Sequence, residues 1–535
     1  MHKLAKYLDL TVSLLLIVAM GVLMSLLSPY MMGFKEQISI FLWDADRISW
    51  YFSNPAVLAA VTGDWITQFY YDNGAAIAIT VALLIILWLG MIRLLRMAGA
   101  HKECRITAML PVIIAGSYMI WPNYPVSGLI GLILSVWAAC GVSAVNDLRI
   151  RTICIGLGTP LLFFLAGGHC ITFALACLLV RRENLKAGLA GALAGMVIML
   201  IMARLYNMTL LQASLYPVVP DYILPSTPVL MLLPLSVVAC LVMTMLRNEV
   251  IPAVICGCCS IVVLSTSFYN DVLELSIKVG TLAYRSQWDK VRMVASENLD
   301  TQYGLFYWNL SYAREGRLPE AMLEYDNNSV SDGLFLSTTL KDSYLSMFYF
   351  TDALLEMGDV SQATDCALFG QTVLPGHYSS RMLRRLAEIS VVTGDYPVAA
   401  KYLSILSRCR NHREWAAGMM ACIEKDSIPS ELQVWRSRTS GRDRFFNIGD
   451  VRSSLLAIST DNGTNRVAVD YLMCSCILEN DLSNFRILYE RFWHGGLDRY
   501  YEVPDLYKQA LYFMTESENS SRYATDRFNL NEGVN

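Results

Sequence analysis

The sequence predicts an all-α protein: a polytopic transmembrane helix bundle of about nine spans, followed by an α-solenoid built from helical repeats. Three observations predict this. Of the 535 residues 55% are hydrophobic and only 16% are charged, a balance that is unusual for a soluble protein. Long apolar runs recur between residues 9 and 269. From residue 281 onward the apolar residues follow a helical period, as amphipathic helices require.

The charge distribution divides the chain into two predicted domains. Residues 1–276 carry 15 Lys and Arg against 13 Asp and Glu, whereas residues 277–535 carry 27 against 33. The first part is therefore the apolar transmembrane domain, and the second has the composition of a soluble domain. An acidic balance in the second part argues against nucleic acid as a partner, because phosphate binding needs a basic surface.

Nine apolar stretches are candidate membrane spans. They are 9–29, 75–92, 107–121, 125–143, 152–166, 170–180, 187–204, 228–246 and 251–269. A bilayer core of about 30 Å needs about 20 helical residues, so the shorter stretches must be tilted or sheltered by their neighbours. The lipid bilayer is therefore the first partner that the sequence predicts. Between 152–166 and 170–180 lies only Gly-Gly-His, which is either a tight outer turn or part of one kinked span.

The basic residues of the loops predict the orientation. With the N-terminus inside, the cytoplasmic segments hold twelve of them: Lys3, Lys6, Arg93, Arg96, Lys102, Arg105, Arg149, Arg151, Arg181, Arg182, Lys186 and Arg247. The outer segments hold three, Lys35, Arg47 and Arg204. Cytoplasmic loops carry the excess of basic residues. After nine crossings residues 277–535 then lie outside, in the periplasm of a bacterial inner-membrane protein.

Internal repeats organise the second half. Their marker is a glycine followed five residues later by an alanine, which matches the tetratricopeptide spacing that lets two antiparallel helices approach closely. The residues that follow this pattern are Tyr312, Gly316 and Ala321, then Gly358, Ala363 and Pro375, then Gly394 and Ala399. A fourth, weaker copy runs from Val467 to Phe492 with Asn480 in the turn position. Stacked copies predict a solenoid, and a generic all-α domain with coincidental glycines is the alternative.

Other side-chain clusters give no defined chemistry. Cys256, Cys258 and Cys259 lie in an apolar run without a nearby His, Asp or Glu, so no metal site is predicted, and the sequence indicates no particular cofactor. An arginine run between the repeats either binds phosphate or an acidic partner or forms a solvated loop. It consists of Arg436, Arg438, Arg442 and Arg444.

The first predicted outer loop, 30–74, carries the candidate chemistry. Asp44 and Asp46 follow an apolar stretch, and the amphipathic segment from Pro55 to Tyr71 contains Asp64. Its aromatic residues suit the surface of a membrane. A carboxylate at such a surface can have a raised pKa and accept a proton from a hydroxyl group. Alternatively, Asp44 and Asp46 cap a short interfacial helix and keep the loop in water.

Two segments carry a resemblance to a family. They are Trp65-Ile66-Thr67-Gln68-Phe69-Tyr70-Tyr71 and Asn465-Arg466-Val467-Ala468-Val469-Asp470-Tyr471-Leu472-Met473. With the nine spans and the repeats, they resemble an uncharacterised bacterial-envelope membrane family with tetratricopeptide-like C-terminal halves. The likeness covers nearly the whole chain. It implies an architecture and no activity.

An acidic outer loop after the first span, followed by many short spans and an outer soluble domain, is similar to GT-C-type glycosyltransferases, which use polyprenyl-phosphate-linked sugars. This resemblance implies that Asp44 or Asp46 acts as a base or binds a divalent ion. It also implies that Arg204, Asp64 and Tyr71 contact a polyprenyl-linked glycan. The sequence shows no second acidic motif in a later outer loop beyond Asp221.

Two functions remain open from the sequence. One is transfer of a sugar from a polyprenyl-phosphate donor at the outer face of the membrane. The other is a membrane-anchored scaffold whose repeats bind a periplasmic protein partner, as such arrays usually do. A coupled transporter is disfavoured because the spans hold almost no internal charge, and ion pathways usually need it.

Overall fold

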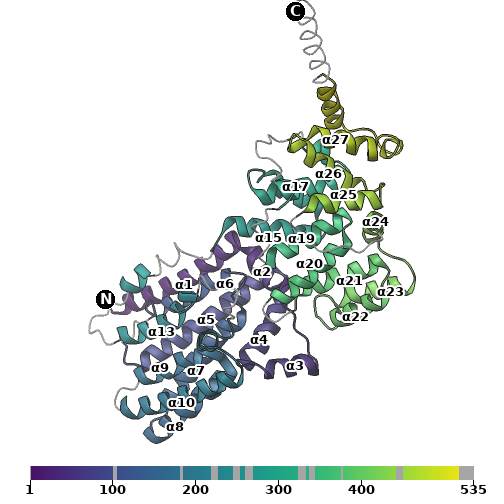
Figure 1. Ribbon diagram of the computed structural model, residues 1–535. Helices are drawn as coiled ribbons and strands as arrows, with labels where there is room; N and C mark the ends of the chain where they lie inside the picture. Colours follow the sequence, from purple (N-terminus) through teal and green to yellow (C-terminus); the bar gives the residue numbers. More distant parts are fainter. Residues whose placement is uncertain are drawn as a thin grey trace, which may run out of the picture. The chain divides into compact units, whose positions relative to one another are not determined.

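A computed structural model describes residues 2–100, 105–180, 185–218, 227–244, 254–259, 269–322, 324, 333–336, 344–374, 378–440 and 450–516. Within these ranges the regular structure is helical throughout (Figure 1). The chain forms two compact units. Unit 1 comprises Met1–Glu274 with Arg408–Asn411, and unit 2 comprises Leu275–Ser407 with His412–Asn535.

Unit 1 contains the long apolar helices. Its helices are α1 (His2–Leu27), α2 (Pro29–Gln37), α3 (Ala45–Phe52), α4 (Val57–Thr67), η1 (Gln68–Tyr71), α5 (Asn73–Met97), α6 (Met109–Ile120), α7 (Val126–Ser143), α8 (Leu148–Ala166), η2 (Gly167–His169), α9 (Cys170–Val180), α10 (Leu185–Leu205), α11 (Leu210–Leu215), α12 (Thr227–Leu230) and α13 (Leu232–Met243).

Five apolar segments among the described residues are long enough to cross a membrane. They are Leu10–Leu27, Asn73–Met97, Val126–Ser143, Leu148–Val180 and Gly188–Leu205. Two shorter apolar helices, α6 and α13, coincide with two more of the nine predicted stretches. Most of the last stretch, 251–269, lies outside the described residues, which include a helix only at 254–259. The structure therefore supports membrane association through five segments, fewer than the nine spans predicted.

Helix α7 is the centre of unit 1. In its 18-residue apolar window 72% of the residues are buried, against 22% for α1 and 28% for α10. Helices α4, α5, α8 and α9 pack around α7 (Figure 1). The outer helices instead expose apolar side chains, among them Leu157 and Leu161 on α8 and Leu193 and Val197 on α10. Such faces are expected where the surrounding medium is lipid.

The chain turns back on itself between α8 and α9. Gly167 has a φ of +75°, a conformation that glycine adopts without steric cost. Phe173 of α9 lies 3.2 Å from the point that a Cβ on Gly158 of α8 would occupy, and α8 and α9 pack against each other. Gly-Gly-His at 167–169 is thus a turn between α8 and α9, which together make up one of the five apolar segments.

Small residues join α8 to α10. A Cβ on Gly195 would lie 2.6 Å from the Thr159 Cβ, and one on Gly191 would lie 2.9 Å from the Thr152 carbonyl oxygen. Gly191 and Gly195 are four residues apart and so lie on the same face of α10. Close approach through glycines at this spacing is a common way for apolar helices to associate where no hydrophobic effect drives them together.

Unit 2 is a succession of helix hairpins. Its helices are α15 (Asp271–Tyr284, of which the first four residues belong to unit 1), α16 (Trp288–Ser296), α17 (Gln302–Ala313), α18 (Leu318–Ala321), α19 (Tyr344–Met357), α20 (Val360–Val373), α21 (Ser380–Thr393), α22 (Tyr396–Leu406), α23 (Arg413–Glu424), α24 (Ser430–Arg438), α25 (Val451–Asp461), α26 (Arg466–Leu478), α27 (Leu482–Leu488), the π-helix η7 (Tyr489–Trp493) and η8 (Leu497–Arg499). Consecutive helices pack against each other from α19 to α22, whereas α24 packs against α19 and α21.

The same backbone turn recurs between the helices of unit 2. Among the described residues, six that follow an α-helix of unit 2 have a positive φ, between 49° and 88°: Ser286, Gly316, Gly358, Gly394, Asp426 and Asn480. Gly495, after the π-helix η7, has a φ of +74° as well. At five of these turns the next residue donates its N–H to the carbonyl five residues earlier, at 2.8 or 2.9 Å, as from Asp359 to Leu354. This is the Schellman bond that ends a helix at a left-handed residue. The sequence pattern identified the three glycines and Asn480 as turn positions but did not identify Ser286 or Asp426.

The helix after each turn begins almost at once and buries a fixed position. At five of the turns it starts two residues after the left-handed residue, and the residue five positions after that residue is fully buried: Val291, Ala321, Ala363, Ala399 and Phe485. Asp359, Asp395 and Asp481 cap these helices with their side chains, which satisfies an otherwise unpaired N–H. Pro375, the predicted end of one repeat, lies outside the described residues.

Candidate functional site

Asp44 and Asp46 belong to the beginning of α3. Asp44 accepts a hydrogen bond from the Arg47 backbone N–H at 2.8 Å, which makes it the N-cap, and its other oxygen accepts from Arg408 of the same unit at 3.0 Å. Asp46 is exposed in the first turn. Both carboxylates thus stabilise the start of a helix, which is the alternative role that the sequence left open for them.

The other predicted substrate-binding residues lie on separate elements. Arg204 is exposed in the last turn of α10, and Tyr71 is exposed at the end of η1. Asp64 lies on α4, where the structure surrounds it with polar groups. Asp221 lies outside the described residues. Within the described ranges no group of three His, Cys, Asp or Glu side chains is placed to hold a metal ion.

Asp64 is the centre of a polar cluster between α3 and α4. The Tyr51 hydroxyl donates to Asp64 Oδ2 at 2.6 Å, and Arg47 Nη2 lies 3.5 Å from the same oxygen. The Arg47 guanidinium also lies over the rings of Trp50, at 4.1 Å, and Tyr51, at 5.0 Å. Four residues of α3 and α4 therefore combine a carboxylate, a phenol, a cation and aromatic faces, and the cluster lies outside the five apolar segments.

Burial changes the acidity of this cluster. Desolvation raises the pKa of Asp64, and the Tyr51 hydrogen bond and Arg47 counteract only part of that rise. Desolvation and the Asp64 charge also raise the pKa of Tyr51. The Asp64 side chain keeps 25% of its surface exposed, so a solute can reach it. A reachable carboxylate with a raised pKa beside a hydrogen-bond donor has the properties of a general base.

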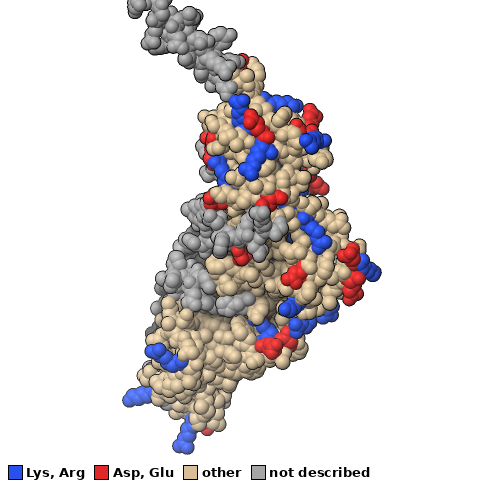
Figure 2. Space-filling model, turned by 45° about the vertical axis from the view of Figure 1, so that its right-hand side comes forward, with Lys and Arg blue, Asp and Glu red and all other residues tan. Residues whose placement is uncertain are grey.

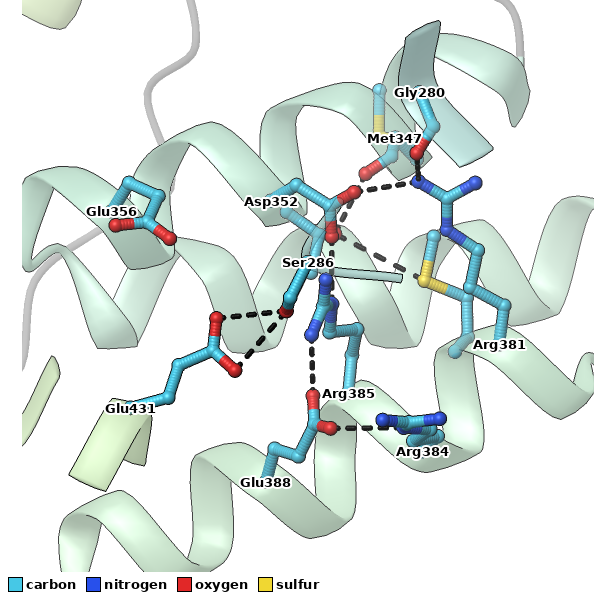
Figure 3. Close-up of polar contacts among 12 residues, drawn as sticks. Gly280, Ser286, Met347, Asp352, Glu356, Arg381, Arg384, Arg385, Glu388 and Glu431 are labelled. Atoms are coloured by element: carbon cyan, nitrogen blue, oxygen red, sulfur yellow. Dashed lines mark hydrogen bonds and ion pairs between the residues drawn. The ribbon is translucent and has the colours of Figure 1, made fainter. Parts of the chain in front are cut away.

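A second polar cluster occupies the core of unit 2 (Figure 3). Asp352 of α19 accepts from Arg381 Nη2 at 2.6 Å and from Arg385 Nε at 2.7 Å. Glu388, one turn along α21, accepts from Arg385 Nη1 at 2.5 Å and from Arg384 Nε at 2.9 Å. These residues are mostly buried, so the ion pairs join α19 to α21 inside the unit. We call these five residues the buried network.

The charges of the buried network do not cancel. Three guanidinium groups face two carboxylates, and all three lie over the ring of Tyr284 on α15, at 4.7, 5.2 and 4.9 Å. Burial would raise the pKa of Glu388, but Arg385 and Arg384 outweigh it and hold that pKa below the ordinary value. Arg381 also donates to the Gly280 carbonyl at 3.1 Å. The network therefore connects three helices and favours the ionised form of Glu388.

The predicted repeat residues are packing residues, and part of the arginine run is bound internally. Tyr312 packs against Trp308 with the ring centroids 4.8 Å apart and the rings tilted. Arg436 and Arg438 donate to backbone carbonyls of unit 2, so neither is a freely solvated loop residue. Arg442 and Arg444 lie outside the described residues. The bonds from Tyr51 and Arg47 to Asp64 carried no sequence signal, because the partners lie 13 and 17 residues apart. The same holds for the bonds from Arg381 and Arg385 to Asp352, which lies 29 and 33 residues away.

The comparisons with known proteins identify a family. A model described as a family of unknown function, DUF6057, matches residues 3–534, so the chain belongs to that family. No curated protein and no solved structure matches the chain. The prediction of an uncharacterised family is thereby confirmed, whereas the likeness to GT-C-type glycosyltransferases and to tetratricopeptide proteins rests on the sequence pattern alone.

Proposed function

We propose that this DUF6057 protein is a membrane-anchored scaffold of the bacterial cell envelope, in which unit 1 holds the chain in the inner membrane and unit 2 binds a protein partner. The observation that carries the proposal is the recurring turn of unit 2, with a left-handed residue after six of its described α-helices and a buried residue five positions later at five of these turns. Regular helix hairpins of this kind form extended binding surfaces in solenoid proteins.

The finer architecture belongs to the same proposal. Unit 1 crosses the membrane nine times, the N-terminus is cytoplasmic, and unit 2 is a tetratricopeptide-like solenoid in the periplasm. Two things support this: the bias of basic residues in the loops, which follows the positive-inside rule, and the surface composition. On the face drawn in Figure 2 unit 1 is mostly uncharged, whereas unit 2 mixes basic and acidic side chains.

Protease added to spheroplasts should digest unit 2, and protection of that unit would refute the orientation.

Site-specific photo-crosslinking in intact cells tests the scaffold. A benzoylphenylalanine at Leu456 or Phe369, both exposed on unit 2, should form a discrete protein adduct of the same mass in every replicate. The matched control is Leu157, an exposed apolar residue of α8, which should yield no such adduct. If the two positions on unit 2 crosslink no more protein than Leu157 does, the scaffold function is wrong.

The cluster around Asp64 favours a second function, sugar transfer from a polyprenyl-phosphate donor at the outer membrane surface. In this function Asp64, and not Asp44 or Asp46, removes the proton from the acceptor hydroxyl. Arg47 supplies positive charge beside the anionic donor. A reachable carboxylate with a raised pKa, hydrogen-bonded to Tyr51 at 2.6 Å, supports this assignment.

The transfer function is tested with purified full-length protein and a polyprenyl-phosphate-linked hexose. Asp64→Asn should abolish loss of the hexose from the donor while donor binding, followed by native mass spectrometry, is kept. Asp46→Asn is the matched control because Asp46 is exposed on the neighbouring helix turn. Equal turnover by both variants, or none by the wild type, would remove this second function and leave the scaffold.

A further inference from the structure

Helix α24 lies across α19 and α21, which are the first helices of the successive hairpins α19–α20 and α21–α22. It packs against α19 and α21, with only Leu432 and Trp435 of its nine residues buried. The Arg385 guanidinium of the buried network lies 5.4 Å from the centre of the Trp435 ring. A nine-residue helix with two buried side chains has little intrinsic stability, so polar contacts must hold it in place.

The arginines of α24 bind the ends of three helices. Arg438 Nη2 donates to the Arg314 carbonyl, just after α17, at 2.7 Å. Arg438 Nη1 donates to the Glu356 carbonyl, near the end of α19, at 3.0 Å. Arg436 Nε donates to the Val392 carbonyl, near the end of α21, at 3.0 Å, and its Nη2 donates to Val391.

These acceptors share a physical origin. The last carbonyls of a helix have no partner within it and carry the negative end of the helix dipole. Because α17, α19 and α21 are each the first helix of a hairpin, their C-terminal carbonyls are repeated acceptors for a cation. We call Arg314, Glu356, Val391 and Val392 the carbonyl ledge, after the backbone oxygens that they contribute.

Side-chain charges complete the ledge. The buried Glu356 carboxylate accepts from Arg438 at 2.9 Å and from Arg314 at 3.0 Å. At the other end of α24, Glu431 accepts from Arg314 at 2.8 Å. It also accepts from the Ser286 hydroxyl at 2.8 Å (Figure 3). Helix α24 is thus held at both ends, and Glu431, Arg314 and Arg438 are all partly exposed. Such bonds can be exchanged for those of another arginine.

We propose that the carbonyl ledge is the surface through which unit 2 binds its protein partner, and that α24 occupies it as an internal ligand. The partner segment is then a basic helix with an aromatic residue and arginines at the spacing of Trp435, Arg436 and Arg438. The inference rests on the proposed scaffold function and names the partner's chemistry. An internal ligand has a high effective concentration, so the free ledge binds such a segment much more tightly than the occupied one.

A labelled peptide tests the ledge. The probe is a fluorescein-labelled peptide of residues 428–440, whose binding to full-length protein in detergent is followed by anisotropy. Arg438→Glu places a carboxylate against Glu356 and should release α24, so the peptide should bind this variant at least tenfold more tightly than the wild type. Arg452→Glu is the matched control because its partner, Glu479, lies on another helix. Equal affinity for all three proteins would overturn the proposal.

The wild-type protein provides a test that does not depend on the folding of a variant. Excess peptide should accelerate hydrogen exchange at residues 430–438 and leave residues 360–373 of α20 unchanged. Unchanged exchange at 430–438 under excess peptide would overturn the proposal even if Arg438→Glu fails to fold. A partner adduct at Phe369 that persists under excess peptide would show that the scaffold function stands and that the ledge is not its docking surface.

Discussion

Replacing Asp352 by Asn isolates the contribution of the buried network. The carboxylate is almost fully buried and accepts from Arg381 at 2.6 Å and Arg385 at 2.7 Å. Asn keeps the size of the side chain but removes its charge. Three guanidinium groups then face the carboxylate of Glu388 alone, and Arg381 and Arg385 each lose a charged acceptor.

The size of the effect follows from the burial. Removing one partner of a buried ion pair costs about 3–5 kcal/mol, because the remaining charge has neither water nor a counter-charge. Since about 1.36 kcal/mol corresponds to a factor of ten, local opening of α19 against α21 should become about 200- to 5,000-fold more frequent. A surface pair gives a much smaller effect, about 0–1 kcal/mol.

Hydrogen exchange on the full-length protein measures this opening. The slowest amides of residues 344–357 and 380–393 should exchange faster in Asp352→Asn by the factor given above. The control is Arg452→Ala, which removes a pair with Glu479 whose side chains are 33% and 39% exposed. Exchange in Asp352→Asn that stays within about fivefold of this control, equivalent to about 1 kcal/mol, would show that the network does not hold the two helices together.

Three further predictions follow from packing, backbone conformation and acidity. Gly195→Leu should destabilise the α8–α10 pair by about 1–3 kcal/mol and lower the melting temperature in detergent. Gly141 has open space around it, so Gly141→Leu should leave the melting temperature unchanged. Equal melting curves for the two variants would contradict the close packing of Gly195 against α8. Gly394→Ala should lower the free energy of unfolding by about 1 kcal/mol because Gly394 has a φ of +82°. Gly418→Ala, on helix α23 with no atoms near the added methyl group, should raise it by about 0.5–1 kcal/mol. Urea unfolding measures both changes, and the reverse order would refute the reasoning. Burial raises the pKa of Asp470 from 3.8 to about 7, so the folded chain holds this proton more tightly than the unfolded chain, and the stability that it contributes is complete below pH 3.8 and lost as pH rises towards 7. Asp470→Asn should flatten this dependence between about pH 4 and pH 7 in denaturant titrations, and an unchanged slope would argue against it.

The turns of unit 2 show what local sequence can predict. Gly316, Gly358 and Gly394 stood out because a left-handed conformation strongly favours glycine, and Asn480 because asparagine tolerates it. Ser286 and Asp426 adopt the same conformation but have no such signal. The repeat was therefore visible at four turns and hidden at two.

The polar sites show where local sequence is insufficient. Asp64 was selected with the acidic residues of the first outer loop, but its partner Tyr51 lies 13 residues earlier and meets it only because α3 packs on α4. The spacing of Asp44 and Asp46 indicated a catalytic or metal-binding pair, yet the two carboxylates stabilise the start of α3. The arginines at 436 and 438 were noticed as a basic run, and their acceptors proved to be helix ends 44 to 124 residues away.

The amino-acid sequence alone determined that one half of the chain is apolar and the other is helical with repeats. Those properties depend on composition and on residues a few positions apart, because helix period, turn conformation and hydropathy are local. Only the tertiary structure decided that Asp64 faces Tyr51 and Arg47, that Asp352 joins two arginines of another helix, and that α24 covers the ends of three helices. Such pairings depend on how helices pack, and the free energy of each buried charge depends on the partner that packing brings to it.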